Sequence, residues 1–210
     1  MSKVVFLDCG SHKGQSIIYA RQKFGAGIKV YSFDAMNFFT EHLTEIYKDD
    51  DNVSIINKAV WVEDCELEFH VSKTKASWGT SIHDRFSEDD TIKVTSDAVD
   101  FSKWIRDNLD INDTNILKLD IEGAEIEVLN KLMDEDTLSY FNLLLGEWHD
   151  QKEEMNLFES TRLVKNRLKQ EYDTELITWE APWFDESLNE MVTFGEYNSS
   201  ELWSKFNKQK

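Results

Sequence analysis

Four side chains in two short segments could do proton or metal chemistry. Asp120 and Glu122 lie close together in one segment, and Glu147 and His149 lie close together in another. A carboxylate can take a proton from a substrate, and histidine changes its charge near neutral pH, so each is a candidate general base. The sequence therefore predicts a catalytic site formed by Asp120, His149, Glu147 and Glu122, provided that the fold brings the two segments together.

Each of these residues also has an alternative explanation. Asp120 is expected at the mouth of a cleft, as a base, an acceptor-orienting group or a metal ligand. Glu122 points the same way as Asp120 if both lie on a strand, but it could instead begin a helix and stabilise the positive end of the helix dipole. His149 could be the base or an ordinary loop histidine, and His12 and His83 are further candidates.

A bound metal ion is the alternative to a metal-free site. Asp120, Glu147 and His149 could together hold Mg²⁺ or Mn²⁺, which are hard ions that suit oxygen ligands. Their spacing matches no recognised metal motif. We therefore predict a site without a metal ion, with the divalent cation as the alternative.

A glycine-containing loop follows the first apolar segment of the chain. Residues 8–14 read D-C-G-S-H-K-G, in which Gly10 permits a sharp turn and leaves room for a ligand that a Cβ atom would block. Gly14 opens the next helix, which begins near Ser16. The dinucleotide fingerprint is incomplete, because His12 occupies the place of one of its glycines, and no phosphate-binding G-K-[ST] follows. A purely structural turn would also explain these glycines.

Two acidic residues at predicted strand ends suit a nucleoside cofactor. Asp34 ends the second apolar segment, 20 residues after Gly14, where a carboxylate can accept hydrogen bonds from both ribose hydroxyls and disfavours a 2′-phosphate. Asp8 can bridge the loop amides and the amino-acid part of a cofactor, or it can simply cap the end of its strand. The loop and Asp34 together indicate a nucleoside site more strongly than either does alone.

Short apolar segments alternate with amphipathic ones, which predicts a parallel, doubly wound α/β sheet. Ligands bind beyond the carboxyl ends of such strands, so the residues named above should converge there. Residues 72–90 form a long polar loop that is expected to be a lid or binding loop, and a late antiparallel hairpin is expected from residues 175–179 and 191–194. The predicted strands are 4–7, 28–33, 53–56, 66–71, 91–99, 115–121, 141–145 and 175–179, and the predicted helices are 16–24, 40–48 with Thr40 as its N-cap, 102–109, 124–133 and 152–172.

One stretch of ten residues carries a specific resemblance to a known protein family. Residues 116–125, I-L-K-L-D-I-E-G-A-E, closely resemble the K-x-D-x-E-G-A-E block of the FkbM-type methyltransferases. The resemblance covers roughly residues 3–150. The chain departs from the family after the second strand, where Phe33-Asp34-Ala35 replaces the usual Phe-Glu-Pro. The other family landmarks are LDCG at 7–10, GQS at 14–16, NKAV at 57–60, SWGTS at 77–81 and VDFS at 99–102.

The resemblance implies a Rossmann-like class I methyltransferase fold, with a mostly parallel seven-stranded sheet, an antiparallel C-terminal strand and helices on both faces. It implies a single domain, 1–210, with a cofactor half at about 1–125 and acceptor-site elements at about 72–90 and 146–200. S-adenosyl-L-methionine is the implied cofactor, and the implied reaction is O-methylation of a sugar hydroxyl, such as that of a glycan deoxyhexose (rhamnose or fucose). A small natural-product or lipid hydroxyl is the alternative acceptor. The implied cofactor contacts are Asp8, Gly10, Ser11, His12, Gly14, Ser16, Asp34, Ala35, Ala59, Val60 and Asp120.

Composition limits the partners and the compartment. The net charge is −18, from 23 basic and 41 acidic residues, which disfavours nucleic acid and anionic membrane surfaces as partners. No apolar run approaches the roughly 20 residues of a membrane helix, and the N-terminus does not read as a signal peptide. Two cysteines without a CxxC pattern indicate free thiols in a reducing compartment. We therefore expect a cytoplasmic protein, either alone or as part of a larger multidomain glycan-modifying protein.

Other classes fit the sequence less well. The single proline, Pro182, excludes the Asn/Asp-Pro-Pro-aromatic motif of adenine methyltransferases, and neither cysteine follows a proline as in cytosine methyltransferases. A NAD-binding Rossmann oxidoreductase would need the glycine that is missing from the loop. A non-catalytic binding module is the alternative from a different class.

Overall fold

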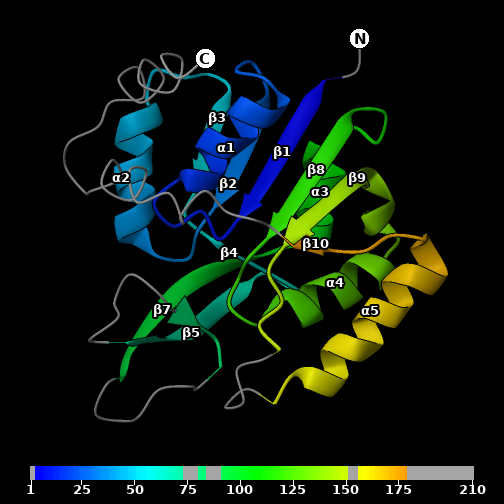
Figure 1. Ribbon diagram of the computed structural model, residues 1–210. Helices are drawn as coiled ribbons and strands as arrows, with labels where there is room; N and C mark the ends of the chain where they lie inside the picture. Colours follow the sequence, from blue (N-terminus) through cyan, green and yellow to red (C-terminus); the bar gives the residue numbers. More distant parts are fainter. Residues whose placement is uncertain (1–2, 73–79, 84–90, 151–155, 179–210) are drawn as a thin grey trace.

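A parallel sheet organises the computed structural model, which describes residues 3–72, 80–83, 91–150 and 156–178 (Figure 1). The sheet has six strands in the order β10-β9-β8-β1-β2-β3, and every neighbouring pair is parallel. The chain first builds outward from β1 to β3 and then returns to place β8 on the other side of β1. Open α/β sheets bind ligands beyond the carboxyl ends of the strands at such a reversal. The strands are β1 (Val4–Cys9), β2 (Lys29–Phe33), β3 (Val53–Ile56), β8 (Thr114–Leu119), β9 (Phe141–Gly146) and β10 (Ile177–Thr178).

Helices cover both faces of this sheet. Successive residues of β1 point to opposite faces, so that Leu7 packs with α3, α4 and α5 while Phe6 packs with α1 and α2. Burial on both faces explains why the strands read as continuous apolar runs in the sequence. The helices are α1 (Gln15–Phe24), α2 (Asn37–Tyr47), α3 (Phe101–Asn108), α4 (Glu125–Asp134), the short 3-10 helix η2 (Thr137–Tyr140) and α5 (Phe158–Tyr172).

A second sheet lies beyond the carboxyl ends of the parallel strands (Figure 1). Its order is β4-β7-β5-β6, with β4 (Ala59–Trp61), β5 (Cys65–Ser72), β6 (Thr80–Ser81) and β7 (Thr91–Asp100). The alternating apolar residues of β5 face inward, and Phe69 packs against Met36 and Phe39 near the start of α2. This contact fixes the second sheet over the edge where a ligand would bind.

The predicted α/β fold with a mostly parallel sheet and helices on both faces is confirmed, but the strand count and the starts of two helices differ. The described residues give the main sheet six strands rather than seven, and segments 59–61, 65–72 and 91–100 pair in the separate sheet. The predicted antiparallel strand at 191–194 lies outside the described residues. Helix α2 begins at Asn37, so Thr40 is not its N-cap; the Thr40 hydroxyl donates to the Asn37 carbonyl inside the helix. Helix α5 begins at Phe158, and residues 151–155 of its predicted start are not described.

In the part of the chain that the structure describes, none of the helices has the length and apolar character needed to cross a membrane.

Candidate functional site

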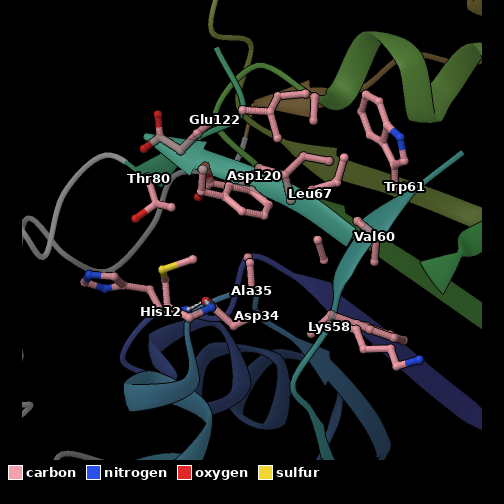
Figure 2. Close-up of a pocket in the computed structure, with 18 of the residues that line it drawn as sticks. His12, Asp34, Ala35, Lys58, Val60, Trp61, Leu67, Thr80, Asp120 and Glu122 are labelled. Carbon is pink, nitrogen blue, oxygen red and sulfur yellow. Dashed lines mark hydrogen bonds between the residues drawn. The ribbon is translucent and has the colours of Figure 1, made fainter. Parts of the chain in front are cut away.

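A pocket lies between the carboxyl edge of the parallel sheet and the second sheet. Strands β1, β2, β8 and β9 each place in its lining the residue that immediately follows them, namely Gly10, Asp34, Asp120 and Glu147. Figure 2 shows His12 and Asp34 on one side of the pocket and Thr80 and Glu122 on the opposite side. Much of the remaining wall is apolar and comes from Phe33, Ala35, Met36, Phe39, Ala59, Val60, Trp61, Leu67, Phe69 and Ile82.

Gly10 brings the ends of β1 and β8 together. Its φ is +85°, which confirms the predicted sharp turn, and a Cβ atom built there would clash with the carbonyl oxygen of Asp120. Gly10 lines the pocket, but the space that its Cβ would fill is occupied by the backbone of Asp120 rather than left for a ligand. The Gly10 amide donates to the Phe33 carbonyl at 2.9 Å, which fixes the turn next to the end of β2.

Asp34 is held rigidly at the wall of the pocket. Its Oδ2 accepts a hydrogen bond from the His12 amide at 2.8 Å, and its Oδ1 accepts one from the Met36 amide at 2.8 Å. Burial raises the pKa of Asp34 to about 6, although these two amides and the Lys118 ammonium lower it. Each carboxylate oxygen can accept more than one hydrogen bond, so the pair keeps acceptor capacity for a ligand.

Lys118 is a buried cation that sequence reasoning did not single out as a functional residue. Its side chain is 1 % exposed, and its ammonium lies 3.2 Å from Asp8 Oδ1 and 3.6 Å from Asp120 Oδ2. Burial alone would lower the pKa of Lys118, but the Asp8 and Asp120 carboxylates raise it above its ordinary value. The ammonium also donates to the Gly10 carbonyl at 2.6 Å. The signal in the sequence was a lysine in an otherwise apolar strand, which must find a carboxylate or carbonyl partner.

Asp8 is the buried anion of this pair. It is fully buried and accepts hydrogen bonds from Ser16 Oγ at 2.6 Å and from Ser32 Oγ at 3.2 Å. These contacts agree with the structural explanation of Asp8, which ties β1 to α1, β2 and β8. Asp8 and Ser16 do not line the pocket, so their predicted contact with a cofactor has no geometric support.

Three carboxylates and one histidine meet at the far end of the pocket. We call Asp120, Glu122 and Glu147 the acidic edge; all three line the pocket. The Nε2 atom of His149 lies 3.5 Å from Glu122 Oε2, 3.7 Å from Asp120 Oδ1 and 4.0 Å from Glu147 Oε1. Burial raises the pKa of Asp120, with Glu122 and Glu147 adding to the increase and Lys118 and His149 opposing it. A carboxylate with a raised pKa is a better proton acceptor near neutral pH.

Glu125 positions His149 and was not predicted to do so. Both residues are buried, and His149 Nδ1 lies 3.0 Å from Glu125 Oε1. The Glu125 carboxylate also accepts the amides of Ile121 at 2.8 Å and Gly123 at 2.9 Å. Glu125 and Glu127, rather than Glu122, are therefore the carboxylates in the first turn of α4. Glu122 precedes that helix with a φ of +58°.

The structure gathers most of the predicted site residues and separates some. Four of the predicted cofactor contacts do not line the pocket: Asp8, Ser11, Gly14 and Ser16. Gly14 is instead the N-cap of α1, where a Cβ atom would meet Leu43 Cδ2 at 2.6 Å. His149, a predicted catalytic residue, does not line the pocket itself; its Nε2 lies within 4.0 Å of each carboxylate of the acidic edge. The predicted cofactor contacts that line the pocket are Gly10, His12, Asp34, Ala35, Ala59, Val60 and Asp120.

The predicted acceptor elements are described only in part. Thr80 and Ile82, from the predicted lid loop, line the pocket, but residues 73–79 and 84–90 lie outside the described residues. The same holds for the C-terminal part of the predicted acceptor region, 179–200. His83 packs beside the site, with its Nε2 3.4 Å from the Gly123 carbonyl.

Comparison with known proteins gave one match. The family model described as the methyltransferase FkbM domain matches residues 8–190 of the chain. That range contains every strand-end residue of the pocket. The searches of curated proteins and of solved structures found no match.

Proposed function

Since the chain belongs to the FkbM methyltransferase family, we propose that it transfers a methyl group from S-adenosylmethionine to a hydroxyl oxygen of a sugar. The pocket supports this proposal, because the Asp34 carboxylate, which can accept hydrogen bonds from a ribose, lies across from the carboxylates of the acidic edge. A glycan deoxyhexose such as rhamnose or fucose is the proposed acceptor, with a small natural-product or lipid hydroxyl as the alternative.

The residues around Asp34 fit the cofactor that the family implies. The Asp34 carboxylate is already fixed by two backbone amides, so ordering it on binding costs little entropy. Its remaining lone pairs suit the two hydroxyls of a ribose. Ala35, Met36 and Phe39 provide an adjoining apolar surface for a flat base. When bound, S-adenosylmethionine supplies an electrophilic methyl group on a sulfonium sulfur.

The acidic edge fits the acceptor end of the reaction. A sugar hydroxyl is a weak acid, so a base must take its proton as the new carbon–oxygen bond forms and the carbon–sulfur bond breaks. Asp120 and Glu122 face the pocket and can accept that proton at a carboxylate oxygen. Leu67 and Phe69 of the second sheet line the same pocket, and their apolar side chains limit the access of competing water.

The proposal extends to partners and compartment. A net charge of −18 favours a small-molecule or glycan acceptor over nucleic acid. The buried Cys9 and the partly exposed Cys65 are both free thiols. We propose a cytoplasmic enzyme on this basis, acting alone or within a larger glycan-modifying protein.

A labelled-donor screen tests the proposal. The chain is incubated with methyl-labelled S-adenosylmethionine and a panel of saccharides, natural products and lipids that carry free hydroxyls. We expect label on a sugar oxygen. Asp120→Asn should lower kcat by about 100-fold or more, while its Kd for S-adenosylhomocysteine stays within a few-fold of the wild type. Glu66→Gln is the matched control, because Glu66 is exposed on β5 and lies outside the pocket.

Two results would count against the proposal. Full turnover in Asp120→Asn would remove Asp120 from the reaction, and transfer of label to nitrogen or carbon would exclude O-methylation. The alternative enzyme class, a NAD-dependent oxidoreductase, predicts instead that NAD raises the melting temperature and that S-adenosylhomocysteine does not.

A further inference from the structure

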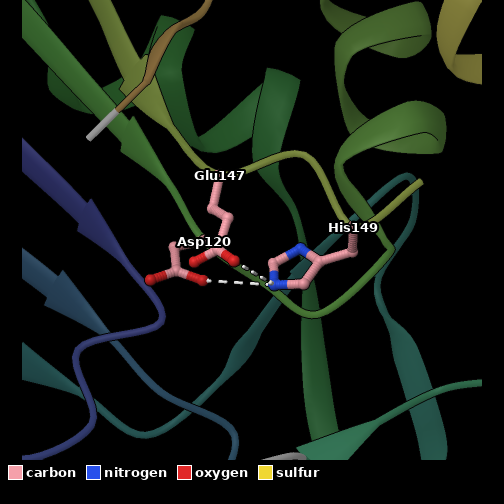
Figure 3. Close-up of side chains that lie close together, drawn as sticks. All are labelled: Asp120, Glu147 and His149. Atoms are coloured by element: carbon pink, nitrogen blue, oxygen red, sulfur yellow. Dashed lines mark ion pairs between the residues drawn. The ribbon is translucent and has the colours of Figure 1, made fainter. Parts of the chain in front are cut away.

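Asp120 and Glu147 of the acidic edge and the adjacent His149 form a cluster of side chains that could hold a metal ion (Figure 3). Asp120 follows β8, while Glu147 and His149 follow the neighbouring strand β9. One potential ligand atom from each of these three residues lies within 4.8 Å of the others. The parallel pairing of β8 and β9 brings the two segments together, although the spacing along the chain matches no metal motif.

The separations within the cluster are somewhat wider than those between adjacent ligand atoms on one ion. His149 Nε2 lies 3.5–4.0 Å from the carboxylate oxygens of Glu122, Asp120 and Glu147. Ligands at about 2.1 Å from an octahedral ion are about 3.0 Å apart when adjacent and about 4.2 Å apart when opposite. A small inward movement of side chains would therefore bring ligand atoms of Asp120, Glu147 and His149 to the spacing of adjacent ligands. Glu147 is 54 % exposed and has room to make that movement.

Glu125 prepares His149 to act as a ligand. The Glu125 carboxylate accepts two backbone amides, and it can only accept from His149 as well, so Nδ1 carries the proton of that contact. In the neutral imidazole, Nε2 then presents its lone pair to the acidic edge. Metal-ligating histidines commonly donate their other ring N–H to a carboxylate in this way.

The charge of the cluster also favours a cation. Three carboxylates surround one buried imidazole nitrogen, and two of them, Asp120 and Glu122, are mostly buried, so water screens the repulsion between these two only in part. Lys118 offsets part of this charge, but its ammonium is 3.6 Å from Asp120 and closer, at 3.2 Å, to Asp8. A divalent ion between the carboxylates and His149 would offset the remainder. The competing explanation is a doubly protonated His149, which could not serve as a base.

We propose that Asp120, Glu147 and His149 bind one Mg²⁺ or Mn²⁺ ion, which holds the hydroxyl of the acceptor at the end of the pocket. The role in catalysis rests on the proposed methyl transfer, whereas metal binding does not depend on it. A hydroxyl bound to a divalent cation loses its proton more readily. Glu122, which lines the pocket beside the three ligands, is then the carboxylate that takes this proton while the oxygen–methyl bond forms and the sulfur–methyl bond breaks.

Manganese binding to the full chain tests the metal site without reference to turnover. Metal-free protein is titrated with MnCl₂, and free Mn²⁺ is followed by electron paramagnetic resonance. We expect one ion per chain and, in electron spin echo experiments on the bound ion, a coupling to an imidazole nitrogen. His149→Ala should abolish that coupling, and Glu147→Gln should weaken binding tenfold or more. Glu125→Gln, which changes the partner of His149 Nδ1 and of the Ile121 and Gly123 amides without removing a proposed ligand, should weaken binding by about 10- to 100-fold.

Control variants separate loss of a ligand from loss of the fold. Glu147 is more than half exposed, so Glu147→Gln tests the site even if His149→Ala unfolds. Glu66→Gln should bind Mn²⁺ as the wild type does, because Glu66 lies on the outer face of β5. Binding of S-adenosylhomocysteine by each variant confirms that the pocket is intact.

The outcomes distinguish this inference from the proposed function. Absence of tight Mn²⁺ binding, or binding that Glu147→Gln leaves unchanged, overturns the metal site. Methyl transfer that survives exhaustive EDTA treatment overturns the role of the ion in the reaction, while supporting the proposed function. Bound Mn²⁺ with an imidazole coupling supports the metal site, even if no saccharide is methylated and the proposed function fails.

Discussion

Cofactor affinity should depend on pH through Asp34. Burial raises the pKa of this carboxyl from an ordinary 3.8 to about 6, against the lowering effects of two backbone amides and Lys118. The ionised carboxylate is the form that accepts hydrogen bonds from two ribose hydroxyls. Binding should therefore be strong above pH 6 and weaken as the pH falls through that value.

The magnitude follows from the pKa. A carboxyl with a pKa of about 6 is about 90 % ionised at pH 7 and about 10 % ionised at pH 5. If only the ionised form of Asp34 binds the ribose, the Kd for S-adenosylhomocysteine should rise about tenfold between these two pH values, which corresponds to about 1.4 kcal/mol. A carboxyl at the ordinary value of 3.8 would change the Kd by less than about 10 % over the same range.

Isothermal titration calorimetry with S-adenosylhomocysteine measures this dependence. Asp34→Asn is the control, since it keeps the shape of the side chain and removes its titration. That variant should bind weakly at every pH and show a flat profile between pH 5 and pH 7. A flat profile in the wild-type protein, or a slope that Asp34→Asn retains, would refute the assignment of Asp34 as the ribose ligand.

Two further predictions concern how the pocket is built. Gly10→Ala should lower the free energy of unfolding by about 2–5 kcal/mol, because the new Cβ would meet the Asp120 carbonyl. Urea denaturation measures this change. The control is Gly27→Ala, since no atom lies within 4 Å of a Cβ built at Gly27, and equal stability of the two variants would contradict the prediction. Lys118→Met should lower the free energy of unfolding by about 3–5 kcal/mol, because it leaves Asp8 buried without its cation. The exposed control is Lys93→Met. If the two variants lose the same stability, the buried Asp8 carboxylate does not need the Lys118 ammonium.

The main sheet and the strand-end residues could be predicted from the sequence because local pattern carries that information. Continuous apolar runs in alternation with amphipathic segments are typical of strands covered on both faces and of the helices that cover them. The topology of such sheets brings their carboxyl ends to one edge. Gly10, Asp34 and Asp120 were therefore predicted to meet, and they line one pocket.

The second sheet was not predicted as a separate unit. Segments 65–72 and 91–100 read as strands, and the structure confirms that they are strands. The alternation of apolar and polar residues along these segments does not show which sheet they join, because strand pairing depends on contacts between residues that are distant in the sequence. Tertiary contacts, such as the packing of Phe69 against Met36 and Phe39, place β5 over the pocket.

The sequence by itself determined the kind of fold, the family block at 116–125 and the acidic strand ends, since each depends on residues close together in the chain. Only the tertiary structure decided what surrounds those carboxylates. Lys118 reaches the Gly10 carbonyl across a separation of 108 residues, and Glu125 supports His149 across 24. Such contacts depend on the register of neighbouring strands and on side-chain direction, which no local pattern specifies.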